Sequence, residues 1–167
     1  MDSASLFSLE VLGRQLKPIV LRFVIGGLCL SGIVYLIAPD QFLALPKNNL
    51  ELWFAIILLY PILSVLPQEL IYRTFLFQRY SSLIRENPIH MIIMSAVLFS
   101  LAHLVFNNWQ VLVFTAIGGL MLAYTYHKSK SVICVSFEHA IWGNLSFTIG
   151  LGEYFSGGTI ANMFTSL

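Results

Sequence analysis

The sequence predicts an all-α protein that crosses a membrane several times. Of its 167 residues, 57% are hydrophobic and only 10% are charged, and the mean hydropathy is +0.81. A soluble domain would carry about 25% charged residues. The apolar residues also form long segments, and a membrane-spanning helix needs about 20 of them in succession. We therefore expect a polytopic transmembrane helix bundle.

Five segments meet or approach the length that a bilayer requires. They lie at residues 18–38, 51–67, 90–106, 109–126 and 131–151. The second continues without a polar break to residue 80, which predicts either a long tilted helix or a bend near Pro61 or Pro67. Because no repeat, low-complexity tract or linker divides the chain, residues 1–167 are expected to form a single membrane domain.

Positive charge falls on alternate connections between these segments. The positions concerned are Arg14, Lys17 and Arg22, then Arg79 and Arg85, then Lys128 and Lys130. The first-to-second connection holds only Lys47, and the third-to-fourth holds no lysine or arginine. The positive-inside rule then predicts a cytoplasmic N-terminus and an external C-terminus, in what we expect to be a bacterial cytoplasmic membrane. A net charge of +1 without a basic run argues against nucleic acid as a partner.

Five ionisable residues lie within or at the ends of the apolar segments: Glu69, Arg73, His103, Glu138 and His139. Each costs about 2.5–3.5 kcal/mol at the centre of a membrane helix if it stays unpaired. We therefore expect a shared polar site between the second, third and fifth segments. Two histidines with one or two carboxylates can activate a water, either as general bases or through a metal, which favours hydrolysis.

Each of these residues also has a purely structural interpretation. Glu69 and Arg73 are four residues apart on one helix face, so they could form an ion pair that fixes the helix or one that holds a catalytic carboxylate. A single histidine on an apolar helix, such as His103, is more often a packing element. The Glu138–His139 dipeptide, in the middle of the fifth segment, is harder to explain by packing and favours a function.

Three motifs follow one another on successive apolar segments: Gln68-Glu69-x-x-x-Arg73, Phe99-x-x-x-His103, and His139 with a following asparagine. In this order they resemble the CPBP family, which includes CAAX prenyl endopeptidases of the Ras-converting type and the bacterial bacteriocin-processing or immunity proteins called the Abi family. The resemblance covers about residues 52–152 and leaves the first span, 18–38, as an N-terminal addition.

The resemblance implies an intramembrane endopeptidase. In such an enzyme a glutamate and His103 would activate a water, while His139 and Asn144 would stabilise the oxyanion. Arg73 would hold the glutamate region in position, together with Gln68. A divalent metal such as zinc, held by His103, His139 and Glu69, is one option that the resemblance leaves open.

The chain departs from the family pattern at two positions. Gln68 replaces the first glutamate, and an amide cannot act as a general base. Glu69 or Glu138 would have to supply the carboxylate, and the sequence favours Glu138 because no cation lies at helical spacing from it. Asn144 lies one residue too far from His139, about 140° around a regular helix, and a π-bulge near Gly143 is one way in which the two could be aligned.

The sequence therefore predicts Glu69, His103, Glu138, His139 and Asn144 as catalytic residues. The expected partners are a membrane-associated peptide or protein substrate and the lipid bilayer. Two alternatives stay open. One is a catalytically silent relative that binds a membrane peptide or protein in immunity or assembly. The other is a small transporter or proton relay, which intramembrane Glu and His would also serve, although no inverted repeat supports it.

Overall fold

The computed structural model describes residues 6–80 and 87–155, and in these ranges the regular structure is entirely helical. The α-helices are α2 (Leu9–Ile37), α3 (Ala44–Asn48), α4 (Leu50–Tyr60), α5 (Leu66–Glu69), α6 (Leu76–Tyr80), α7 (Pro88–Ala102), α8 (Trp109–Ser129) and α9 (Val132–Thr148). Two π-helical turns, Pro61–Val65 and Leu70–Phe75, join α4, α5 and α6 into one continuous helix. Two 3₁₀ turns, His103–Phe106 and Leu151–Phe155, follow α7 and α9.

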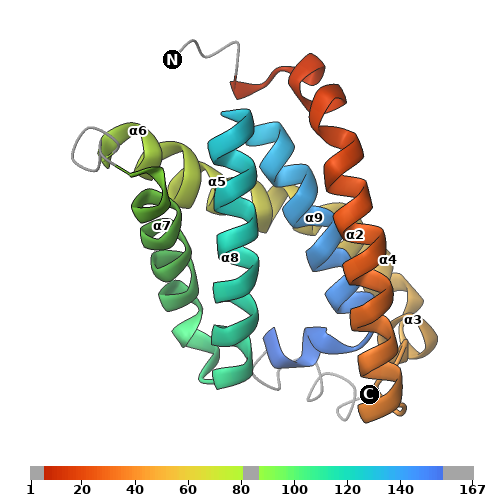
Figure 1. Ribbon diagram of the computed structural model, residues 1–167. Coiled ribbons are helices and arrows are strands. Elements are labelled where there is room, and N and C mark those ends of the chain that lie inside the picture. The colour runs from red at the N-terminus through yellow and green to blue at the C-terminus, as the bar shows by residue number, and fades with distance from the viewer. Residues whose placement is uncertain (1–5, 81–86, 156–167) are drawn as a thin grey trace.

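The long helices alternate in direction through the bundle (Figure 1). The start of α2, the end of α6 and the α8–α9 turn lie at one end, while α3 and the α7–α8 connection lie at the other. The connections that carry the excess of positive charge are therefore at the same end, as the alternating pattern requires. Arg85, one of the charges behind that pattern, lies outside the described residues. Which end faces the cytoplasm stays a prediction.

Four helices are long and apolar enough to cross a membrane: Leu9–Ile37, Leu50–Tyr80, Pro88–Phe106 and Trp109–Ser129. The fifth predicted segment forms α9, which has only 17 residues and packs between α2 and α8. Large apolar side chains on the outer faces of the bundle are exposed, among them Leu28, Leu58 and Ile117. Soluble monomers rarely expose contiguous apolar surface on this scale. The predicted polytopic bundle is confirmed, and the chain is an integral membrane protein.

Side-chain caps set the starts of the helices. Asn87, Asn108 and Ser131 each accept a hydrogen bond from a backbone N–H in the first turn of α7, α8 and α9, respectively. Such caps satisfy N–H groups that have no partner inside the helix. Ser8 caps α2 in the same way, so this helix begins nine residues before the predicted membrane span, which starts at Pro18. The helix thus contains the apolar segment and extends beyond it at its N-terminal end.

The second helix combines the two alternatives that its sequence left open. It stays continuous from Leu50 to Tyr80, and its α-helical pattern is interrupted by a π-helical turn that starts at Pro61. Proline has no N–H to donate to the carbonyl four residues earlier, so an α-helix is weakened at this point. The π-helical turns change the direction in which the following side chains point. Such turns occur frequently at functional sites.

Candidate active site

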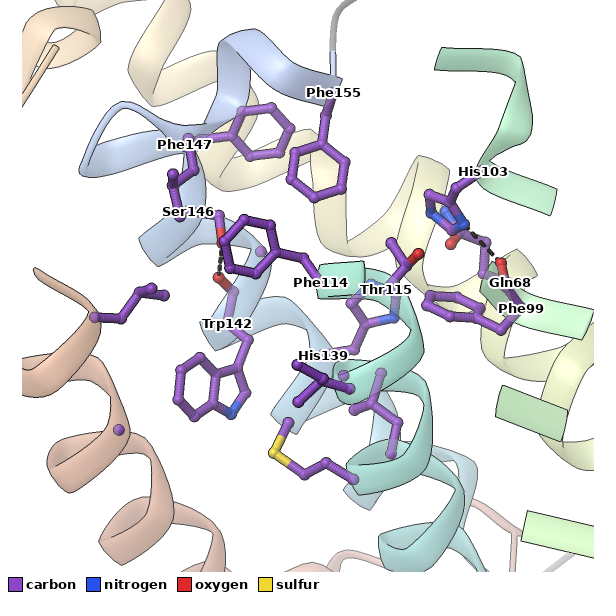
Figure 2. Close-up of a pocket in the computed structure, with 18 of the residues that line it drawn as sticks. Gln68, Phe99, His103, Phe114, Thr115, His139, Trp142, Ser146, Phe147 and Phe155 are labelled. Carbon is purple, nitrogen blue, oxygen red and sulfur yellow. Dashed lines mark hydrogen bonds between the residues drawn. The ribbon is translucent and has the colours of Figure 1, made fainter. Parts of the chain in front are cut away.

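A cavity of about 590 Å³ lies inside the bundle, where α2, α4, α5, α7, α8 and α9 meet. Most of its lining is apolar, and its polar lining comes from Tyr60, Ser64, Gln68, His103, Thr115, His139 and Ser146. Figure 2 shows labelled side chains from α5, α7, α8 and α9 around this space. The predicted site between the second, third and fifth segments is therefore a real cavity that contains both motif histidines.

His139 is held by the glutamate that follows Gln68. Its Nδ1 lies 2.7 Å from Oε1 of Glu69, and the Oε2 of Glu69 lies 3.4 Å from Nε of Arg73. Glu69 and Arg73 have side chains with no exposed surface. The carboxylate of Glu69 therefore lies between the imidazole of His139 and the guanidinium of Arg73, where it accepts the Nδ1–H of His139 and fixes the orientation of the ring. The other ring nitrogen, Nε2, faces the hydroxyl of Tyr60.

His103 is fixed by a different acceptor. It begins the 3₁₀ turn after α7, and its Nδ1 lies 2.7 Å from the carbonyl oxygen of Phe99. A carbonyl can only accept, so Nδ1 carries the proton and Nε2 of the neutral ring is again the free base. His103 lines the cavity through its ring. In the motif Phe99-x-x-x-His103, the backbone carbonyl of the phenylalanine thus fixes the tautomer of the histidine one turn later.

The ring of Phe99 organises the site as well. Its centroid lies 4.7 Å from that of His103 and 5.6 Å from that of His139, and the guanidinium of Arg73 lies 4.6 Å above its face. A cation over an aromatic face is attracted by the ring quadrupole. Phe99 therefore separates the two histidines at a fixed spacing and stabilises the buried arginine beside them.

Gln68 lines the same cavity, where the family pattern would have its first glutamate. Its Nε2 donates to Oγ of Ser64 at 2.7 Å, and its Oε1 is buried and accepts no hydrogen bond from the described residues. The structure thus brings Gln68, Glu69, Arg73, His103 and His139 together.

Glu138 lies in a different environment. Its Oε1 accepts a hydrogen bond from the guanidinium of Arg22 on α2 at 2.8 Å, and the same nitrogen also donates to Oγ1 of Thr125 at 2.9 Å. Glu138 is fully buried and is not among the described residues that line the cavity. No cation lies at helical spacing from Glu138 on its own helix, but Arg22 reaches its carboxylate from α2.

Asn144 does not turn towards the cavity either. The π-bulge that would have aligned it with His139 does not form, because α9 is a regular α-helix from Val132 to Thr148. Nδ2 of Asn144 instead donates to the carbonyl oxygen of Ile57 at 3.3 Å. That carbonyl is the one to which Pro61, four residues later, has no N–H to donate. Asn144 therefore satisfies a backbone group that the proline leaves without its α-helical partner.

Tyr60, the last residue of α4, is a site residue that the sequence did not predict. Its hydroxyl lies 3.1 Å from Nε2 of His139, and the side chain lines the cavity. A tyrosine in the middle of an apolar segment counts as one more aromatic residue, so periodicity gives it no weight. The signal that could have found it is Gly143, one turn after His139, where a glycine leaves room for a neighbouring side chain.

The residues suggested for a metal do not fit one. Within residues 6–80 and 87–155, no group of three His, Cys, Asp or Glu side chains could hold a metal ion. Both carboxylate oxygens of Glu69 are directed at protein partners, His139 and Arg73, and Nδ1 of His103 is bound to a carbonyl. Glu69 and His139 therefore bind each other, and His103 binds the backbone carbonyl of Phe99. This arrangement does not fit a metal ion held by the three side chains.

Comparison with known protein families places these residues in context. Residues 50–145 match the family described as type II CAAX prenyl endopeptidase, Rce1-like, and this match covers more than half of the chain. The chain belongs to this family. Neither the comparison with curated proteins nor that with solved structures gave a match.

The matched segment contains the whole cluster around His139, including Tyr60, Glu69, Arg73 and His103. The first helix lies outside it, so Arg22 and the wall that α2 contributes to the cavity are not part of the matched segment. The family match confirms the resemblance to the CAAX endopeptidases. It describes a protease family as a whole, and the roles of individual residues in this chain follow from the geometry alone.

Proposed function

We propose that this protein is an intramembrane endopeptidase in which His103 activates the attacking water. One observation carries the proposal: both motif histidines line one cavity, and each has its Nδ1 bound to a protein acceptor. A general base needs a free lone pair within reach of a water in the cavity, and Nε2 of His103 provides one. Packing alone would not require two histidines oriented in this way.

The reaction follows from these positions. Nε2 of His103 removes a proton from water while the water oxygen attacks the carbonyl carbon of the scissile peptide bond. The resulting tetrahedral intermediate carries a negative charge on the former carbonyl oxygen. His103 then donates its proton to the leaving nitrogen, the C–N bond breaks, and a carboxylic acid and an amine are released. General acid–base catalysis of this kind contributes about 10²–10⁴-fold to the rate.

Glu69, Arg73 and His139 position the site. The carboxylate of Glu69 is fully buried between the two other side chains, so their relative orientation is fixed by one ionised group. A low-dielectric, water-poor environment makes such fixed charges and dipoles more effective than they would be in water. In this scheme Gln68 binds Ser64 and does not take a proton.

The substrate that we propose is a peptide with a lipid-modified residue next to the scissile bond. Apart from its polar groups the cavity is lined by apolar side chains, among them Leu30, Ile33, Phe114, Ile117 and Met121. Ile33 and Ile117 are more than half exposed on the outer surface of the bundle. A hydrocarbon chain attached to the peptide would therefore remain in contact with apolar surface from the bilayer to the cavity.

The test is cleavage of a quenched fluorescent peptide with a farnesylated cysteine near its C-terminus, by the full chain in liposomes. His103→Ala should abolish cleavage while the protein stays inserted, because a membrane helix is held by its own backbone hydrogen bonds. His90→Ala removes an exposed histidine from the same helix and should leave the rate unchanged. Full activity of His103→Ala would reject His103 as the base.

One observation favours a second candidate, a silent family member that binds a membrane peptide or protein without cutting it. Gln68 occupies the cavity position where a carboxylate could take a proton, and its amide is bound to Ser64. Gln68→Glu separates the two functions in the same liposome assay. If the wild-type chain cuts, this variant should retain or raise activity; if only Gln68→Glu cuts, the natural chain is the silent binder.

A further inference from the structure

Tyr60 lines the cavity, and its hydroxyl lies beside the ring of His139. It lies 3.1 Å from Nε2 of His139, and the two rings meet edge to face with centroids 6.0 Å apart. Because Glu69 accepts the Nδ1–H of His139, Nε2 is the ring nitrogen that faces the hydroxyl of Tyr60. In the tautomer with its proton on Nδ1, Nε2 accepts this hydrogen bond and the hydroxyl of Tyr60 donates it.

An anionic tetrahedral intermediate needs hydrogen-bond donors that are already in place. Two other hydroxyls that line the cavity donate to backbone carbonyls of their own helices: Ser146 to Trp142 at 3.0 Å and Thr115 to Val111 at 2.7 Å. The hydroxyl of Tyr60 instead donates to a side-chain nitrogen that also lines the cavity. A substrate oxygen can replace that nitrogen as the acceptor without breaking a helix.

Gly143 makes this position available. A Cβ atom at residue 143 would overlap the ring and the hydroxyl of Tyr60, so the tyrosine packs directly on the backbone of α9 one turn after His139. A second contact holds the ring, whose centroid lies 5.3 Å from that of Phe147 in an edge-to-face arrangement. The hydroxyl thus fills the space that a side chain at position 143 would otherwise enter, while Asn144 binds Ile57 elsewhere.

We propose that Tyr60 is a catalytic residue whose hydroxyl donates a hydrogen bond to the carbonyl oxygen of the substrate as negative charge develops there. The proposal rests on the proposed peptidase function of the cavity. Before substrate binds, Nε2 of His139 accepts this hydrogen bond and keeps the hydroxyl in the cavity. Glu69 holds His139 in place, so the positions of all three side chains are linked.

The experiment compares Tyr60→Phe with the wild-type chain in liposomes. The variant keeps the ring that packs on Gly143 and removes only the hydroxyl, so the fold should be retained. We expect kcat to fall by about 10²–10³-fold, the usual effect of one lost oxyanion donor, with a much smaller change in KM. Tyr35→Phe removes a hydroxyl from an exposed tyrosine of α2 and is the matched control, with kcat unchanged. Unchanged kcat in Tyr60→Phe would overturn the proposal.

A binding measurement separates this proposal from the proposed function. A phosphinic analogue of the farnesylated peptide carries a tetrahedral anionic group that mimics the oxyanion but cannot be cut. Tyr60→Phe should weaken its binding about a hundredfold, with little effect on binding of the parent peptide. If the wild-type chain cuts no peptide, the proposed function fails, and the binding measurement alone then tests Tyr60. Equal binding of the phosphinic peptide to both chains, or to neither, would overturn Tyr60 as the oxyanion donor.

Discussion

Glu138 and His139 are neighbours in the chain but belong to two different buried polar clusters. His139 joins Glu69, Arg73 and Tyr60 in a cluster that opens onto the cavity. Glu138 joins Arg22 and Thr125 in a cluster between α2, α8 and α9. Adjacent residues on a helix point about 100° apart, so α9 presents one of them to the cavity and the other to α2.

The comparison shows that a buried charge does not by itself identify the reactive group. Both clusters contain a carboxylate without exposed surface and an arginine that neutralises it. In the Arg22–Glu138 cluster both members are used to join helices. In the His139 cluster the ion pair holds a histidine ring whose other nitrogen reaches the cavity. The two clusters differ in whether their polar groups line the cavity. His139 and Tyr60 line it, whereas Arg22 and Glu138 do not.

Among variants of the two buried ion pairs, the largest effect is expected from Glu69→Gln, which keeps the shape of the side chain and removes its charge. Arg73 would remain buried without a counterion, and breaking such a pair costs about 3–5 kcal/mol of stability. His139 would lose the anion that fixes its tautomer, and the loss of such a supporting partner typically costs about 10–100-fold in activity. Unfolding in mixed detergent micelles and the liposome cleavage assay measure the two effects.

The control for this variant is Glu51→Gln, which removes an exposed carboxylate from the first turn of α4 in the same long helix. It should change neither stability nor cleavage by a comparable amount. Equal behaviour of Glu69→Gln and Glu51→Gln would show that the His139 cluster does not depend on its carboxylate.

A smaller loss of stability is expected from Arg22→Met, which tests whether the Arg22–Glu138 cluster serves only to join helices. The variant leaves Glu138 buried without its cation, but the Arg22 side chain is 35% exposed, so its contribution is partly screened. We expect a loss of about 2 kcal/mol in the free energy of unfolding, below the range for fully buried pairs. Adding Glu138→Gln should recover part of this loss, and simple addition of the two single losses would show that the side chains are not coupled.

The smallest effect on catalysis is expected from Glu138→Gln alone. The carboxylate faces Arg22 and lies apart from the cavity, so kcat should stay close to that of the wild-type chain while stability falls. A loss of about a hundredfold in kcat, as expected for a missing general base, would instead support the sequence-based choice of Glu138. This measurement compares directly with Glu69→Gln in the same assay.

Much of the fold was predictable because membrane insertion leaves a strong signal in composition. Uninterrupted apolar segments predicted the helical bundle, and alternating positive charge predicted which connections lie at the same end of it. The grouping of Glu69, Arg73, His103 and His139 was predictable for the same reason, since isolated charges are costly in a membrane and must find partners.

The errors all concern directions and partners that no single helix determines. Arg22 reaches Glu138 from a helix 116 residues away in sequence, and helical spacing cannot reveal such a contact. Alignment of Asn144 with His139 would need a π-bulge in α9, which is a regular α-helix. The π-helical turns occur instead in the second helix, at Pro61–Val65 and Leu70–Phe75. Tyr60 was overlooked because its role depends on the missing side chain of Gly143 on another helix.

The two π-helical turns give the second helix two places that can absorb a change in its length. A π-helical turn joins residues five apart and so contains about one residue more than an α-helical turn. Deletion of one residue between 61 and 65 would convert that turn to α-helix and leave Gln68, Glu69 and Arg73 directed as they are now. The same deletion in the regular α-helix before it, Leu50–Tyr60, would instead turn the two parts of the helix relative to one another by about 100°, although the hydropathy of the segment would hardly change.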